Sequence, residues 1–125
     1  MWWIVDAMNV IGTRPDGWWK DRQRARVRLV EHLERWVAPE SRQVVVVFEG
    51  PTSSPIHSSV IRIHHAPRAI ANSADDEIIR IVCTDDNPEQ ITVVTSDTTL
   101  ADRVRTAGAG VCPAARFRDL IDPLT

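Results

Sequence analysis

Acidic side chains follow three of the apolar segments that we expect to form buried strands. Asp6 ends the first apolar run, Glu49 follows the second, and Asp97 comes shortly after the last long one. A further acidic segment, Ser73–Glu77 (SADDE), opens a predicted helix. In open α/β sheets, ligands bind outside the carboxyl ends of the strands. We therefore expect these four segments to deliver carboxylates to one rim of the sheet.

Carboxylates crowded at one rim repel one another and raise one another's pKa unless a cation compensates. Mg²⁺ and Mn²⁺ take hard oxygen ligands and fill their remaining positions with water. Such an ion activates a bound water and neutralises charge on a phosphoryl oxygen, which is the chemistry of phosphodiester hydrolysis. The pattern predicts Mg²⁺ or Mn²⁺ as cofactor, and no covalent intermediate is needed.

Each acidic residue also has a structural explanation. Ser73 and Asp76 fit the spacing of a capping box, and acidic residues stabilise a helix N-terminus. Ser96 or Asp97 would equally serve as the N-cap of the next helix. Each aspartate taken singly is more often structural, so the functional hypothesis depends on their combination with Asn9.

The elements that must position these residues alternate between strands and helices. The predicted strands are Trp2–Asp6, Gln43–Phe48, Val60–His64 and Ile91–Thr95, with a short fifth at Gly110–Cys112. The predicted helices are Lys20–Val37, Ser73–Thr84, Leu100–Ala107 and Ala114–Ile121. In the first helix, Val27, Val30, Leu33 and Val37 recur at helical spacing and are expected to face the core. This alternation indicates a parallel or mostly parallel sheet covered by helices.

Length and composition indicate one ordinary globular domain over residues 1–125. The formal net charge of −2 shows no overall basic excess of the kind that marks many nucleic-acid-binding domains. Cys83 and Cys112 lack metal-ligand spacing, so we expect two buried free thiols in a reducing cytoplasm. No apolar stretch approaches the roughly 20 residues needed to span a bilayer, and a cytoplasmic location is expected.

Four short motifs together resemble the NYN domains, in particular the YacP-like group of the PIN-like nuclease superfamily. Residues Ile4–Ile11 (IVDAMNVI) resemble the opening VDGxN motif, and Val46–Gly50 (VVFEG) resembles the second-strand vvFDg segment. Ser73–Asp76 (SADD) resembles the tADd helix start, and Val93–Asp97 (VVTSD) resembles the vvTsD strand end. The order and spacing of the motifs fit nearly the whole chain.

The resemblance implies a PIN-like, Rossmann-type three-layer α/β fold with a mostly parallel central sheet flanked by helices. It also implies metal-dependent cleavage of RNA, as by an endoribonuclease, at an acidic Mg²⁺ or Mn²⁺ site. The positions that match the family's acidic ligands are Asp6, Asp75 and Asp97, and Asn9 matches the polar partner beside the first aspartate.

Three further positions match the family less directly. Ser96 matches a small hydroxyl position beside the last aspartate, where it would contact substrate. Asp76 is the weaker member of its acidic pair and would act as an outer-sphere ligand. Glu49 stands where many relatives place aspartate, so its longer side chain would contact the metal directly, through water, or not at all.

A basic and aromatic segment beyond Asn9 suits contact with RNA. Its candidate substrate-binding residues are Arg14, Trp18, Lys20 and Arg22. Basic side chains neutralise phosphates and aromatic rings stack on bases. The alternative is that Trp18 and Trp19 close the core over the following helix. The alternating arginines from Arg22 to Arg28 are expected to form a solvated helix surface.

Other functions with acidic strand ends fit the sequence less well. A response-regulator receiver needs a lysine after a late strand, but the only lysine is Lys20. A dehalogenase-type phosphatase needs a D-x-D motif, but the sequence after Asp6 is Ala-Met-Asn. Two alternatives stay open: a non-catalytic RNA- or protein-binding module, and a PIN-type toxin held by an antitoxin-like partner. A ribosome or another protein that presents the RNA is a further conceivable partner, and the oligomeric state is left open.

Overall fold

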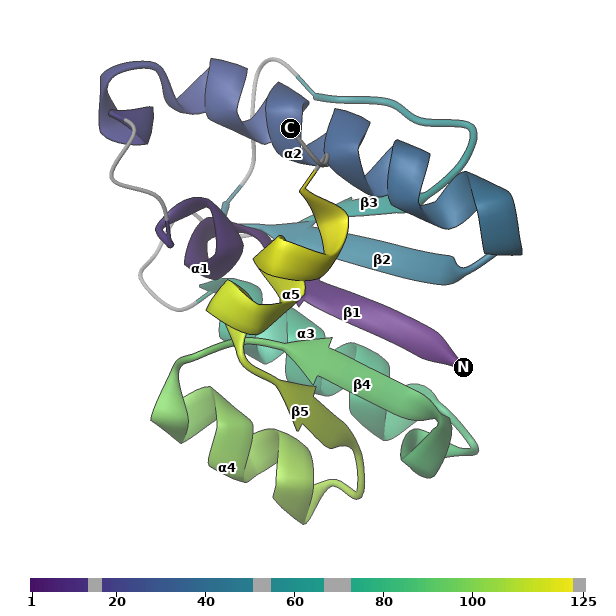
Figure 1. Cartoon of the computed structure of the whole chain (residues 1–125). Helices are drawn as coiled ribbons and strands as arrows, with labels where there is room; N and C mark the ends of the chain where they lie inside the picture. Colours follow the sequence, from purple (N-terminus) through teal and green to yellow (C-terminus); the bar gives the residue numbers. More distant parts are fainter. Residues whose placement is uncertain (14–16, 51–54, 67–72, 123–125) are drawn as a thin grey trace.

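Five strands form one sheet in the computed structural model, which describes residues 1–13, 17–50, 55–66 and 73–122. The strands are β1 (Trp2–Asp6), β2 (Gln43–Phe48), β3 (Arg62–His65), β4 (Ile91–Val94) and β5 (Gly110–Cys112). Their order across the sheet is β3-β2-β1-β4-β5, and all four pairings are parallel (Figure 1). The predicted sheet is confirmed, and within the described residues it is wholly parallel.

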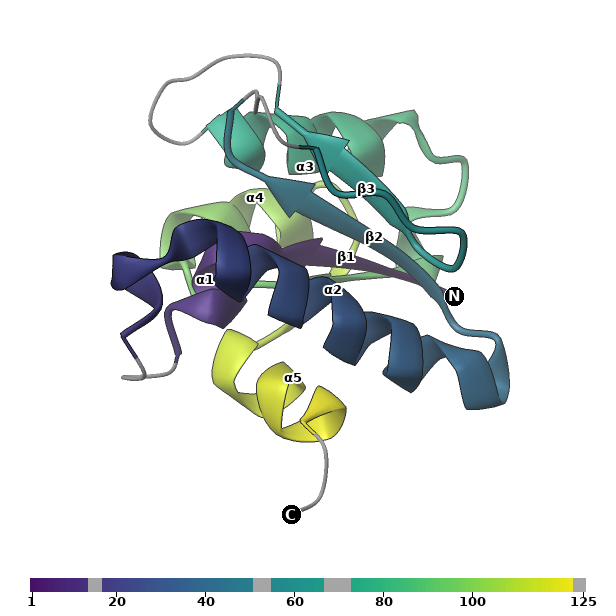
Figure 2. The same cartoon turned by 90° about the horizontal axis from the view of Figure 1, so that it is seen from above.

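The helices cover both faces of the sheet and give the predicted three layers. They are α1 (Ala7–Ile11), α2 (Arg22–Val37), α3 (Ser73–Thr84), α4 (Thr98–Thr106) and α5 (Ala114–Ile121). Figure 2 shows α1, α2 and α5 on one side of the sheet and α3 and α4 on the other. Each face has its own apolar core, because strand side chains alternate between the two faces. Val44–Phe48 lies between both cores and is buried throughout, as its continuous apolar run predicts.

Several predicted boundaries differ from the observed ones. The third strand begins at Arg62 rather than Val60, whose side chain is 47% exposed, and the fourth ends at Val94 rather than Thr95. The helix expected from Leu100 begins at Thr98, and the helix expected from Lys20 begins at Arg22. A 3₁₀ turn, Trp18–Lys20, precedes the latter helix.

Helix α2 packs a slightly different stripe against the sheet from the one expected. Asp21 caps the helix by accepting a hydrogen bond from the backbone N–H of Arg24 (3.0 Å), which fixes its start and rotation. Leu29 takes a core position, whereas Val27 is 37% exposed, so the predicted burial of Val27 was wrong.

Two further sequence expectations have structural outcomes. Cys112 is half-buried and Cys83 is exposed, so the expectation of two buried thiols was wrong for Cys83, although both thiols are free. Within the described ranges, no helix combines the length and apolarity that crossing a bilayer requires.

The order of the strands fixes where a ligand site should lie. From β1 the chain moves to β2 and β3 on one side, and it then crosses over to β4 and β5 on the other (Figure 1). The carboxyl ends of β1 and β4 therefore flank the point where the winding direction reverses, and this crevice is the usual ligand site of doubly wound sheets. Asp6 and Thr95–Asp97 lie at these two strand ends.

Candidate active site at the carboxyl edge of the sheet

Asp6 is a buried carboxyl group with other carboxyl groups around it. It is the last residue of β1 and only 6% exposed. Burial raises its pKa from 3.8 to about 7; a hydrogen bond from Thr95 opposes this, and the charges of Asp75, Glu49 and Asp97 add to it. Acidic residues from three other segments therefore lie within electrostatic reach of Asp6.

Asp75 belongs to the same group of carboxylates. It lies in the first turn of α3 and is half-buried. Burial raises the pKa of its carboxyl group, as do the charges of Asp97, Glu49 and Asp76, while the Arg103 guanidinium lowers it. Charges from all four segments thus act on Asp6 and Asp75, while the role of these carboxylates as metal ligands stays a prediction. We call Asp6, Asp75 and Asp97 the acidic triad.

Thr95 connects two members of the acidic triad, and sequence reasoning did not assign it to the site. Its hydroxyl donates a hydrogen bond to Oδ2 of Asp6 (3.0 Å) and accepts one from the backbone N–H of Asp97 (3.1 Å). The residue is 1% exposed, so neither bond competes with bulk water. Thr95 therefore orients the Asp6 carboxylate and holds the turn that carries Asp97.

Replacing Thr95 by valine tests this positioning role, because valine keeps the shape and loses the hydroxyl. We expect Thr95→Val to destabilise the protein by about 2 kcal/mol, since a hydrogen bond to a charged group is worth roughly 1.5–3 kcal/mol. For the metal-dependent RNA cleavage that the sequence predicts, loss of a partner that orients a ligand should also reduce the rate about 10- to 100-fold. Urea unfolding and a cleavage assay measure both effects. Thr92→Val in the preceding strand β4 is the control, and equal effects of the two changes would contradict the role.

Asn9 and Ser96 also join β1 and β4 beyond the ends of the strands. Oδ1 of Asn9 accepts a hydrogen bond from the backbone N–H of Ser96 (2.9 Å). The Ser96 hydroxyl accepts one from the backbone N–H of Ala114, at the start of α5 (2.9 Å). Asn9 thus fixes the β4–α4 turn, whereas its predicted role, in which the amide holds a carboxylate or a metal-bound water, stays a prediction. Ser96 has a structural partner, and its contact with substrate stays a prediction.

Asp97 combines the structural and the functional interpretation. It is the N-cap of α4, where its Oδ1 accepts a hydrogen bond from the backbone N–H of Leu100 (2.9 Å). Its charge nevertheless reaches both Asp6 and Asp75. A helix cap uses one carboxylate oxygen, so the cap and a ligand role are compatible.

The two aspartates at the start of α3 have different surroundings. Asp76 is 73% exposed and pairs with Arg103 of α4 (3.3 Å), so it lies at the outer margin of the carboxylates. The Ser73 hydroxyl accepts a hydrogen bond from the backbone N–H of Gly50 (3.3 Å). These partners differ from those of a capping box. They tie the start of α3 to the end of β2, next to exposed Glu49.

The donor chemistry of this edge fits a hard divalent cation. The groups at this edge are carboxylates, and the ionised form of buried Asp6 is costly among them unless a cation compensates its charge. In the described part of the chain, no three His, Cys, Asp or Glu side chains already stand close enough together to hold a metal ion. Mg²⁺ usually keeps several waters and binds through one or two carboxylates, so it does not require a preformed protein cage.

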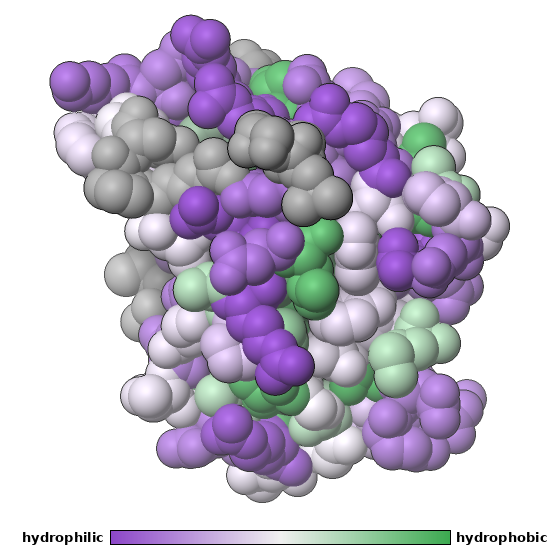
Figure 3. All heavy atoms as spheres, in the orientation of Figure 1, coloured by the Kyte–Doolittle hydropathy of each residue, from purple (hydrophilic) through white to green (hydrophobic). Residues whose placement is uncertain are grey.

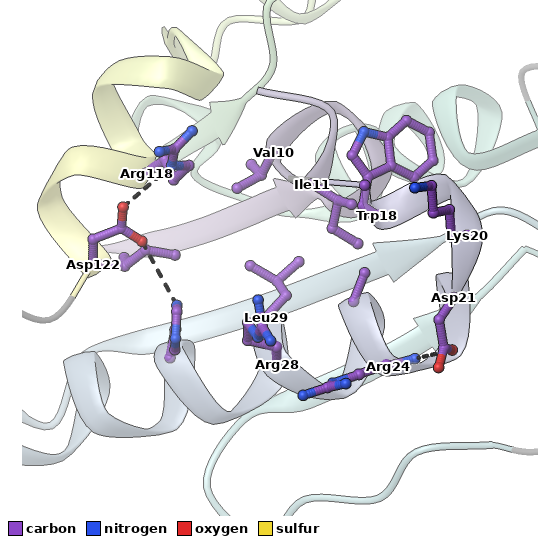
Figure 4. Close-up of a pocket in the computed structure, with 14 residues that line it drawn as sticks. Val10, Ile11, Trp18, Lys20, Asp21, Arg24, Arg28, Leu29, Arg118 and Asp122 are labelled. Carbon is purple, nitrogen blue, oxygen red and sulfur yellow. Dashed lines mark hydrogen bonds and ion pairs between the residues drawn. The ribbon is translucent and has the colours of Figure 1, made fainter. Parts of the chain in front are cut away.

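The candidate substrate-binding residues lie along the face that carries α1, α2 and α5. Trp18 is half-buried and packs against the core, as one of the two interpretations expected, and it lines a cavity together with Lys20 (Figure 4). Its contact with RNA bases stays a prediction. The Arg22 guanidinium lies over the Trp18 ring, 5.6 Å from its centroid. Trp19 is 53% exposed and does not close the core. Arg14 lies outside the described residues.

Three of the four alternating arginines of α2 are exposed, as expected of a solvated helix surface: Arg22, Arg24 and Arg28. Arg24 and Arg28 line the cavity of Figure 4, opposite Arg118 of α5. The Arg26 guanidinium lies over the Phe48 ring, 6.0 Å from its centroid. The sequence did not show that Arg24 and Arg28 share a cavity with Arg118, because α5 is almost 100 residues away from α2 in the sequence.

Two solved structures share this fold. Both are of Rae1 (YacP) from Bacillus subtilis, one of them a point mutant, and both superpose with a TM-score of 0.75. The mutant is 23% identical, with 96% of this chain and 76% of that chain covered; the other is 22% identical, with 97% and 75% covered. Identity at this level shows a common fold and no more. No curated protein sequence matches the chain.

A family model covers nearly the whole chain. The model of the YacP-like NYN domain matches residues 3–125, which contain all five strands apart from the first residue of β1, together with every acidic residue discussed above. NYN domains form a family of nucleases, in keeping with the acidic edge and its position at the reversal point of the sheet. The chain belongs to the YacP-like NYN domain family.

Proposed function

We propose that this protein is a metal-dependent ribonuclease that hydrolyses phosphodiester bonds of RNA at the acidic triad. The observation that carries the proposal is Asp6, a buried carboxyl group whose pKa is raised to about 7 by burial and by carboxylates from three other segments. Strongly perturbed ionisable groups at a ligand crevice mark functional sites. Membership of a nuclease family supports the same conclusion.

Asp6, Asp75 and Asp97 are the residues that would hold Mg²⁺ or Mn²⁺. Glu49 and Asp76 would act through water, since both are exposed and Asp76 already pairs with Arg103. A bound divalent ion supplies Lewis acidity and an activated water for attack on phosphorus. This chemistry requires no nucleophilic side chain.

The chain's own residues orient the acidic triad before any ligand arrives. Thr95 directs the Asp6 carboxylate, and Asn9 fixes the turn that presents Asp97. The Asp97 side chain uses Oδ1 as a helix cap, and in the ranges that the structure describes no hydrogen bond to Oδ2 is present. Preorganisation of this kind lowers the cost of assembling the site during reaction.

RNA would reach the acidic triad across the face that carries the 3₁₀ turn Trp18–Lys20. We propose that Lys20 and Arg22, together with Arg14, neutralise phosphates and that Trp18 stacks on a base. Ser96, at the carboxyl end of β4, would contact the sugar–phosphate backbone of the RNA. Positive side chains are needed here because the carboxylates alone repel RNA.

Incubation of the purified protein with labelled single-stranded and structured RNA tests the proposal. Cleavage is expected with Mg²⁺ or Mn²⁺ and is expected to stop when EDTA is added. RNA binding without cleavage under all conditions would favour a non-catalytic binding module. Cleavage that continues in EDTA would contradict the role of the metal.

A further inference from the structure

A cavity of about 330 Å³ lies between α1, α2 and α5. Figure 4 shows Val10 and Ile11 entering it from α1, Leu29 from α2 and Arg118 from α5. Ligand pockets in proteins typically occupy about 300–1,000 Å³, have apolar walls and carry a few convergent polar groups. This cavity, which we call the basic pocket, has these features.

The rim of the basic pocket carries positive charge in excess. Its cationic residues are Lys20, Arg24, Arg28 and Arg118. Both of its carboxylates have structural partners: Asp21 caps α2, while Asp122 pairs with Arg118 (3.2 Å) and lies 3.7 Å from His32. Among the described residues, the side chains of Lys20 and Arg24 form no ion pair. The rim therefore offers an anion two cationic side chains that form no ion pair within the described residues.

The wall of the basic pocket is apolar and partly aromatic. Val10, Ile11, Leu29 and Ile121 are buried core residues that line it, and half-buried Trp18 closes one side. An inorganic anion has no apolar surface that could pack against such a wall. A ligand that matches both parts carries an anionic group joined to a flat, largely apolar ring, which is the chemistry of a nucleotide.

Other surfaces fit this chemistry less well. Figure 3 shows hydrophilic side chains over α2 and α5, with only small apolar patches beside α5. A second hollow, lined by residues of α3 and α4 such as Ile79 and Arg103, is wide open. Its arginine already pairs with Asp76. Neither surface combines uncompensated charge with an enclosing apolar wall.

Helix α1 follows Asp6 and contributes two residues to the wall of the basic pocket. Asp6 immediately precedes this helix, and Val10 and Ile11 of the same helix line the pocket. Four residues of α-helix advance roughly 6 Å, at 1.5 Å per residue. Along the chain, one short helix therefore separates the basic pocket from Asp6.

We propose that the basic pocket binds a nucleotide, with its phosphate beside Lys20 and Arg24 and its base against Trp18 and Ile11. The nucleotide comes from one of two sources: a residue of the RNA strand next to the scissile bond, or a free mononucleotide. The first source rests on the proposed ribonuclease function. The binding itself does not depend on that function.

Isothermal titration in EDTA tests the proposal, with 5′-AMP, adenosine and inorganic phosphate as probes. We expect saturable binding of 5′-AMP that is at least about tenfold tighter than binding of either fragment. The double variant Lys20→Ala/Arg24→Ala should weaken 5′-AMP binding at least about tenfold, because hydrogen bonds to charged groups are worth roughly 1.5–3 kcal/mol. Arg35→Ala, an exposed arginine of α2 outside the pocket, is the matched control and should bind normally.

Three outcomes would overturn the proposal: no saturable binding of 5′-AMP, equal binding of phosphate and 5′-AMP, or equal affinity of the double variant and the control. Amide chemical-shift changes on the wild-type protein give a test that needs no variant, and they should cluster at Val10, Ile11 and the Trp18–Lys20 turn. Changes confined to other segments would contradict it.

A competition experiment separates the two sources. Binding is measured with Asp6→Asn in EDTA so that no cleavage occurs. Displacement of 5′-AMP by a short RNA then supports a residue of the RNA strand as the bound nucleotide. Simultaneous binding of both supports a free nucleotide. A protein that binds 5′-AMP here but never cleaves RNA would refute the ribonuclease proposal and leave the nucleotide site standing.

Discussion

Asp6→Asn is expected to reduce RNA cleavage at least about 100-fold while leaving the fold intact. Asparagine has nearly the same shape as aspartate and still offers Oδ1 to the Thr95 hydroxyl. It removes the one fully buried negative charge of the acidic triad, and with it the strongest attraction for a divalent ion. Metal-assisted charge stabilisation is worth several kcal/mol, and each 1.36 kcal/mol changes a rate tenfold.

Initial rates on a labelled RNA at saturating Mn²⁺ measure this effect. Asp86→Asn is the matched control, because Asp86 is exposed and precedes β4, at the opposite end of the sheet from the acidic triad. The control should cleave at the wild-type rate. Undiminished cleavage by Asp6→Asn would exclude Asp6 from the reaction, whatever the structure of the site.

Without divalent cations, the ionisation of Asp6 is expected to make the folded protein less stable as the pH rises. Its pKa is about 7 in the folded state against 3.8 ordinarily, so between these values the folded state binds the proton more strongly than the unfolded state does. The stabilising contribution is complete below pH 3.8 and is lost as the pH passes 7. Each tenfold difference in proton affinity is worth about 1.4 kcal/mol, so this group accounts for about 4 kcal/mol.

The measurement compares urea unfolding of the wild type and Asp6→Asn in EDTA from pH 5 to pH 8. Other groups titrate in both proteins and cancel in the difference, so Asp6→Asn should gain stability relative to the wild type as the pH rises. Mg²⁺ at 100 times its dissociation constant should then stabilise the wild type by about 2.7 kcal/mol at pH 8 and leave Asp6→Asn nearly unchanged. A difference that does not depend on pH would show that Asp6 has an ordinary pKa.

The sheet was predictable because its strands are buried on both faces. The continuous apolar run Val44–Phe48 indicates a buried strand. The helices Ser73–Thr84 and Ala114–Ile121 were predicted with the bounds that are observed. Helix α1 was missed because five residues are too few to show a helical period. The burial of Val27 was misjudged because the Asp21 cap, which sets the rotation of α2, depends on the preceding 3₁₀ turn.

Residue types and their positions predicted part of the site. The part that depends on tertiary contacts could not be predicted from the sequence. Aspartates at two strand ends and at one helix start predicted the acidic triad, because parallel strands deliver their carboxyl ends to one edge. Thr95 was indistinguishable in sequence from any β-branched strand residue, and only its two hydrogen bonds reveal its role. Arg24 joins Arg118 at one cavity solely through the packing of α2 against α5.

A crystal structure of the protein with Mn²⁺, with an anomalous difference map for manganese, tests most directly whether the acidic triad binds a metal ion. The account predicts an anomalous peak between Asp6, Asp75 and Asp97, with carboxylate oxygens about 2.0–2.2 Å from the ion, as is usual for hard divalent ions of this size. The peak should vanish in Asp6→Asn crystals. A peak bound elsewhere on a protein that cleaves RNA, or no peak in a protein whose cleavage requires Mn²⁺, would contradict the assignment of the acidic triad as the metal site.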